Sequence, residues 1–164
     1  MTKEELKEKD VTRQHILEAN EETRKHINRV RFLINNFIIA LLDRAESHDA
    51  SKLESPEVEI FARYTPKLKE LTYGSEEYKQ TLAEMKPALD HHYEVNAHHP
   101  EHGEFGIDDM DLVDIIEMLC DWKASSERHA DGDVRQSIKI NTDRFSMNQQ
   151  LVNILYNSLG FVDD

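Results

Sequence analysis

Apolar residues recur at steps of three and four along the stretch from Thr12 to about Ala45. They are Ile16, Ala19, Ile27, Val30, Leu33, Ile34, Phe37, Ile38 and Leu41. Steps of this length match the turn of an α-helix, so the stretch predicts one long helix whose apolar density is highest after Ile27. Residues 1–10, which are rich in Lys and Glu, predict only a frayed turn or a short exposed helix before it.

The next part of the chain is divided by proline. Ser55 is expected to cap a short helix over 56–64, with Pro56 at its first position, where the missing N–H costs nothing. Pro66 then marks the segment 65–75 as a loop. We therefore expect one short helix followed by the clearest connecting segment of the molecule.

A second helix-forming stretch covers 76–93, and Pro87 predicts a kink or a restart within it. The segment 96–106 contains one proline and two glycines, so regular helix is excluded there. Asp108 is expected to cap the following helix, over 109–129, whose apolar side faces the core.

Two further helices, over 133–144 and 147–159, are predicted to close the fold, and the second carries an apolar stripe. No stretch alternates long enough to form a sheet, and no repeat is visible. The sequence therefore predicts an all-α protein, a single-domain bundle of about six to seven helices over 1–164. Its core is expected within about 12–130, with the helices of 133–160 closing it.

Composition narrows the range of partners. The formal net charge of −13 opposes binding to a nucleic-acid polymer, because that affinity comes from Lys and Arg on phosphates. Small phosphorylated ligands remain compatible, since a bound metal can supply positive charge locally. The single cysteine, Cys120, excludes an internal disulfide and is expected to be buried in an apolar helix. No stretch has the roughly 20 apolar residues of a membrane span, so we expect a cytoplasmic protein without a membrane partner.

The candidate chemistry centres on the doublet His48-Asp49, at the end of the long predicted helix. Adjacent imidazole and carboxylate groups can close on one divalent metal if other helices bring further ligands. His26 lies upstream and Asp121 lies in an apolar helix downstream. These four residues offer two imidazoles and two carboxylates. Mixed nitrogen and oxygen donors favour Mn, Fe, Co, Ni or Zn over Ca or Mg.

A histidine-rich run between 91 and 102 adds to this inventory. Its histidines are His91, His92, His98, His99 and His102. Polar loops do not usually collect histidine, so these side chains are expected to bind a second metal ion or to contact a substrate. For His26, with Glu22 one turn earlier, a plain half-buried ion pair remains an alternative.

This constellation resembles the HD-domain metal-dependent phosphohydrolases, whose pattern is a helix-borne His, a His-Asp doublet and a distal Asp. Some features are similar to the HD-GYP branch: Lys52 follows the doublet, Glu22 precedes His26, and His91-His92 begins a comparable segment. The Glu, Asp and Gly positions of that segment are altered, and no Gly-Tyr-Pro follows. The whole chain also resembles a family of small uncharacterised proteins found in phages and their bacterial hosts.

The resemblance implies a hydrolase that cleaves a phosphate ester of a small nucleotide or related molecule, as a phosphomonoesterase or phosphodiesterase. Hydroxide generated at one or two metal ions would be the nucleophile, Asp49 would bind metal and orient the water, and Lys52 would hold a phosphate oxygen. Two alternatives stay open. One is a non-enzymatic helical module that binds a protein partner or a nucleotide and carries a structural or vestigial metal site; the other is an oxygen-using di-iron enzyme. A homodimer also remains open.

Overall fold

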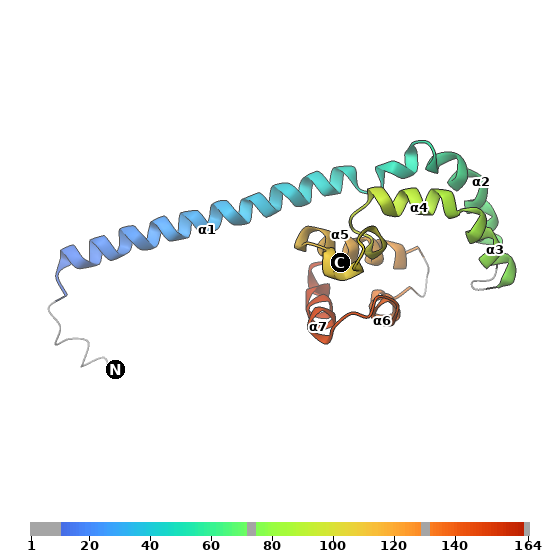
Figure 1. Cartoon of the computed structure of the whole chain (residues 1–164). Helices are drawn as coiled ribbons and strands as arrows, with labels where there is room; N and C mark the ends of the chain where they lie inside the picture. Colours follow the sequence, from blue (N-terminus) through green and yellow to red (C-terminus); the bar gives the residue numbers. More distant parts are fainter. Residues whose placement is uncertain (1–10, 72–74, 129–131, 163–164) are drawn as a thin grey trace. The chain divides into compact units, whose positions relative to one another are not determined.

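The computed structural model describes residues 11–71, 75–128 and 132–162, and over these residues it confirms the all-α prediction with seven α-helices (Figure 1). The stretch 1–10, where the sequence predicts fraying or a short helix, lies outside the described residues. The sequence also predicts a single domain over 1–164. The contacts of the structure divide the chain into two compact units, Met1–Leu42 and Asp43–Asp164.

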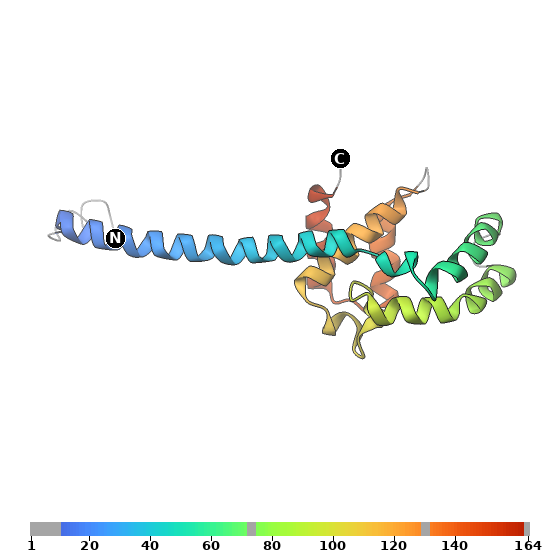
Figure 2. The same cartoon turned by 90° about the horizontal axis from the view of Figure 1, so that it is seen from above.

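Helix α1 (Arg13–Ser47) is the long helix that the apolar steps predict, and Figure 2 shows it unbroken. Thr12 caps it, because its Oγ1 accepts the backbone N–H of His15 at 3.2 Å. No side chain of α1 is buried. Its exposed large apolar residues are Ile16, Leu17, Ile27, Val30, Phe32, Leu33, Ile34, Phe37, Ile38, Ile39 and Leu42. An exposed apolar surface of this extent is typical of segments that bind another protein or a membrane surface.

Helix α2 (Glu57–Glu70) differs from the prediction at both ends. It begins one residue after Pro56, and it continues through Pro66, so the loop predicted from 65 onward is wrong up to Glu70. Contacts with α3 (Glu76–Glu84) and α4 (Lys86–Val95) hold the helix together past the proline. Packing therefore outweighs the local cost of the proline ring.

The expected restart within 76–93 is confirmed. Ser75 caps α3 by accepting the N–H of Tyr78, and α4 begins at Lys86 with Pro87 in its first turn. After α4 the chain forms only two short 3₁₀ turns, Pro100–His102 and Gly106–Asp109. The irregular segment predicted over 96–106 is therefore confirmed.

Helix α5 (Leu112–Ser126) is shorter than predicted and has a different cap. The cap is Asp111, not Asp108: its carboxylate accepts N–H groups of Val113 and Asp114, while Asp114 reaches back to the N–H of Asp111. Cys120 is exposed, so the prediction of a buried thiol is wrong.

The apolar core of the second unit is formed by α5, α6 (Val134–Arg144) and α7 (Gln149–Ser158). Its buried members are Leu119, Val134, Ile138, Met147, Val152, Leu155 and Leu159. The helices predicted over 133–160 are present, but they supply most of the core themselves, whereas the sequence places the core within 12–130. Among the described residues, no helix combines the length and the apolar run needed to cross a bilayer.

Candidate metal centre

Asp49 lies at the turn where α1 ends. Its backbone adopts the left-handed conformation, with φ of 54° and ψ of 14°, which aspartate tolerates better than most residues. A short 3₁₀ turn, Ala50–Leu53, follows directly. The sharp change of direction places the Asp49 carboxylate between the end of α1 and the residues of α4.

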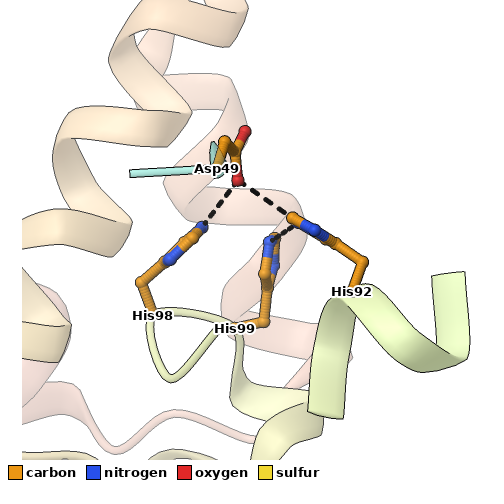
Figure 3. A group of neighbouring side chains, drawn as sticks. All are labelled: Asp49, His92, His98 and His99. Atoms are coloured by element: carbon orange, nitrogen blue, oxygen red, sulfur yellow. Dashed lines mark hydrogen bonds and ion pairs between the residues drawn. The ribbon is translucent and has the colours of Figure 1, made fainter. Parts of the chain in front are cut away.

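Three imidazoles lie around one oxygen of Asp49 (Figure 3). The Nε2 atoms of His92 and His98 are 3.3 Å and 3.6 Å from Asp49 Oδ1, and His99 Nε2 is 2.8 Å from His92 Nε2. One ligand atom from each of the four residues lies within 4.8 Å of the others. His92 comes from α4, and the other two histidines come from the segment after it. This is a compact set of one carboxylate and three imidazoles.

A buried carboxylate orients His92. Glu57, in the first turn of α2, is fully buried, and its Oε2 is 3.0 Å from His92 Nδ1. Because a carboxylate only accepts, Nδ1 carries the proton and donates it, and the lone pair of Nε2 faces Asp49. The other oxygen of Glu57 is 2.7 Å from Nδ1 of His91. A carboxylate behind a histidine is the usual support of a metal-binding imidazole.

Glu117 on α5 is a second carboxylate that orients imidazoles, those of two more histidines. Its Oε1 is 2.9 Å from His48 Nδ1 and 3.1 Å from His98 Nδ1. Its Oε2 accepts Arg44 Nη1 at 2.7 Å, and Arg44 Nη2 also donates to Asp114 at 2.7 Å. The sequence favours Asp114 as a solvated side chain, but it is buried and paired with Arg44.

A second set of donors meets the other oxygen of Asp49. His48 Nε2 is 3.6 Å from Asp49 Oδ2 and 3.8 Å from Asp121 Oδ1. The ammonium of Lys52 donates to the same Oδ2. Asp49 therefore presents one oxygen to His92 and His98 and the other to His48, with Lys52 beside it.

The protonation of the cluster follows from its burial. Burial, together with the charges of His98 and His92, lowers the pKa of His99 to about 3. Burial also lowers the pKa of His98. For Asp49, burial alone would raise the pKa, but the close contact with His92 and the hydrogen bond and charge of Lys52 outweigh it, and the pKa is lowered. At neutral pH His98 and His99 are therefore neutral imidazoles and Asp49 is an ionised carboxylate, the forms that bind metal.

Other residues of the sequence-predicted site lie elsewhere. His91 touches the cluster only through Glu57, and Nδ1 of the exposed His102 donates to the carbonyl oxygen of Tyr93 at 2.9 Å. His26 and Glu22 are exposed residues of α1 in the first compact unit, and Glu22 pairs with Lys25 at 2.8 Å. Their predicted role as metal ligands stays a prediction.

Glu57 and Glu117 are the residues of the candidate site that the sequence does not predict. Each looks like an ordinary acidic residue of a helix. One signal was available for Glu117: it lies four residues before Asp121, so the two share a face of an otherwise apolar helix. For Glu57 no such signal exists, because a glutamate in a first helical turn is already explained by the helix dipole.

Two cavities border the cluster. One, of about 520 Å³, is lined by His98 and Glu117 together with Arg44, Ser47, Ala50, Ser51, Glu54, His91, Val95, Asn96 and Ala97. The other, of about 240 Å³, is lined by His99 and Asp121 together with Tyr93, Pro100, Glu101, Trp122, Ser125, Ser137, Asn141, Arg144 and Phe145. The cluster is therefore within reach of small molecules from two sides.

The fold and the site define an all-α protein with a buried group of histidines and carboxylates that could hold a metal ion. The chain belongs to a family of unknown function, DUF5662, whose model matches residues 15–160. No curated protein and no solved structure matches the chain.

Proposed function

We propose that the protein is a metal-dependent phosphohydrolase acting on a small phosphate ester, such as a nucleotide or a related molecule. One observation carries the proposal: His48, His92 and His98 each have Nδ1 on a buried carboxylate and direct Nε2 toward Asp49. Aligned imidazoles held in one tautomer around a carboxylate are the arrangement that divalent transition metals require.

The donor atoms themselves support a metal. Asp49 Oδ1 and His98 Nε2 are buried, yet neither has a hydrogen-bond partner among the described residues. A buried polar atom without a partner costs free energy, so such atoms are retained where a ligand satisfies them. Asp49, His92, His98 and His99 would hold one ion, and His48 and Asp121 would hold a second that shares Asp49.

The charges around the cluster also favour a cation. Five carboxylates, those of Asp49, Glu57, Asp114, Glu117 and Asp121, are accompanied by only two cationic side chains, Arg44 and Lys52. Buried like charges repel strongly unless positive charge is added. One or two divalent ions would compensate this excess and would give a phosphate group a positive site in an otherwise acidic protein.

The chain's own residues would contribute in two ways, and a bound metal would add a third contribution. Glu57 and Glu117 fix the tautomers of the imidazoles. A divalent metal, when bound, lowers the pKa of a coordinated water molecule and so supplies the nucleophile at neutral pH. Lys52, fixed beside Asp49 by its ion pair, adds a positive charge where the negative charge of the reacting phosphate increases.

The test is metal analysis of protein purified without a His-tag, followed by assays of phosphate esters with Mn, Co, Ni and Mg. We expect bound metal and turnover for the wild type and for His102→Gln, a control at an exposed histidine outside the cluster. Asp49→Asn should lose both while keeping its helical content by circular dichroism, since asparagine also tolerates the left-handed turn. Bound metal with no turnover of any phosphate compound would contradict the hydrolase and favour the binding module.

A further inference from the structure

The smaller cavity has a composition that the metal cluster does not explain. Three of its residues, Ser137, Asn141 and Arg144, follow each other on α6 at steps of four and three, so they form one polar face of that helix. On α5, Asp121 and Ser125 are four residues apart and face the same cavity. Two helices that bury apolar residues in the core thus direct hydroxyl, amide and guanidinium groups into one space.

This cavity also reaches both sets of metal-binding residues. His99 belongs to the group around Asp49 Oδ1, and Asp121 belongs to the group around Oδ2; both line the smaller cavity. The larger cavity touches the cluster through His98 and Glu117, whose facing atoms already bind each other. A molecule that reacts at the metal centre therefore has access to both sets from the smaller cavity.

Arg144 is positioned to receive an anion there. Glu101 holds the guanidinium through Nη2, and the group lies over the ring of Phe145 at 4.7 Å. A guanidinium has five N–H donors in a planar fork that matches a phosphate, so donors remain beyond the contact with Glu101. In the larger cavity the corresponding cation, Arg44, already binds two carboxylates.

The size of the cavity limits what can enter. The cavity has a volume of about 240 Å³. Pockets for drug-sized ligands start at about 300 Å³. A sugar phosphate fits this space, whereas the base of a nucleotide would extend beyond it. The hydroxyl and amide groups of Ser125, Ser137 and Asn141 suit the hydroxyl groups of a sugar.

We propose that the cavity between α5, α6 and the Tyr93–Glu101 segment recognises a sugar phosphate, with Arg144 on the anionic group and the polar face of α6 on the sugar hydroxyls. The proposal rests on the phosphohydrolase function. The sugar phosphate is either a free pentose or hexose phosphate or the ribose phosphate of a nucleotide whose base lies outside. Arg144, Asn141 and Ser137 are then specificity residues that metal binding does not need.

The experiment compares ribose 5-phosphate, glucose 6-phosphate and AMP as substrates of metal-loaded protein. We expect Arg144→Met to raise KM for the best substrate by about tenfold or more, consistent with the loss of one charged contact, with metal content unchanged. Two controls are matched to it. Arg135→Met removes an arginine of the same helix that lies outside the cavity, over Tyr156, and Glu54→Gln changes the larger cavity; both should keep the wild-type KM.

The substrates separate the two sources of the sugar phosphate. Faster turnover of ribose 5-phosphate or glucose 6-phosphate than of AMP identifies the free sugar phosphate, and the reverse identifies the nucleotide. An unchanged KM in Arg144→Met, or a KM changed by Glu54→Gln instead, overturns the assignment of this cavity while leaving the hydrolase intact. If none of the three substrates is turned over, the binding of ribose 5-phosphate is measured by calorimetry instead. Binding that Arg144→Met weakens supports the cavity without the hydrolase, and no binding to the wild type overturns it.

Discussion

The orientation of the Asp49 carboxylate depends on a backbone conformation that few residues adopt. The left-handed turn at φ 54° lets its two oxygens face different groups, His92 and His98 on one side and His48 on the other. The importance of His48-Asp49 is visible in the sequence as a doublet, and the structure brings both residues together with Asp121. The buried carboxylates behind the imidazoles are not visible in the sequence, since burial of Glu57 and Glu117 depends on how three helices pack.

Glu57 provides a test at this scale. Glu57→Gln keeps the shape of the side chain but removes the charge that, on the proposed function, would make the His92 imidazole a better donor to a metal. We expect metal affinity to fall by about 10- to 100-fold, the usual effect of changing such a supporting group, as measured by competition with a chelator. Glu59→Gln, at an exposed position of the same helix, is the control and should bind metal like the wild type. Equal affinities for all three proteins would exclude an orienting role for Glu57.

Among the elements, α2 shows most clearly why local sequence rules fail. Pro66 is a sound loop signal by itself, because it removes a helical hydrogen bond and crowds the preceding turn. The helix nevertheless continues to Glu70, since its contacts with α3 and α4 offset that cost. The helix restart predicted from Pro87 is correct. Pro87 lies in the first turn of α4, where the backbone N–H that proline lacks is not needed. The sequence therefore predicts which segments are helical, but it places the ends of α2 and α5 at the wrong residues.

The two prolines give a paired prediction. Pro66→Ala should raise the free energy of unfolding by about 2 kcal/mol, because the helix regains a hydrogen bond and this gain exceeds the loss of rigidity in the unfolded chain. Pro87→Ala should lower it by about 0.5 kcal/mol, since only the rigidity is lost. Urea denaturation followed by circular dichroism measures both. Changes of the same sign and size would mean that Pro66 does not strain α2.

For the whole molecule, the buried histidines link stability to pH. The ordinary pKa of histidine is about 6.5, whereas the pKa of His99 is lowered to about 3 by burial and by the neighbouring imidazoles. Between these values the unfolded chain binds a proton that the folded chain does not. The free energy of unfolding therefore rises with pH across this window. The stabilising contribution of the neutral imidazole is lost progressively as the pH falls below about 6.5.

This loss can be measured on metal-free protein by urea denaturation at pH 7.5, 6.0 and 5.0. His99→Gln should reduce the slope by up to about 1.4 kcal/mol per pH unit, the contribution of one proton. His102→Gln changes an exposed histidine and should keep the slope of the wild type. A slope that is the same in His99→Gln and the wild type would contradict the burial of a neutral imidazole at this position.

Helix α5 belongs to the apolar core and to the candidate metal centre at once. Leu119 packs against α6 and α7, while Glu117 and Asp121 of the same helix reach the histidines. Closely packed interiors transmit small displacements, so a change of side-chain volume at Leu155, which touches no candidate ligand, also shifts the carboxylates on α5. The packing of the core is therefore coupled to the geometry of the cluster. A core substitution that preserves stability can still disturb the candidate site, because it moves one of these carboxylates.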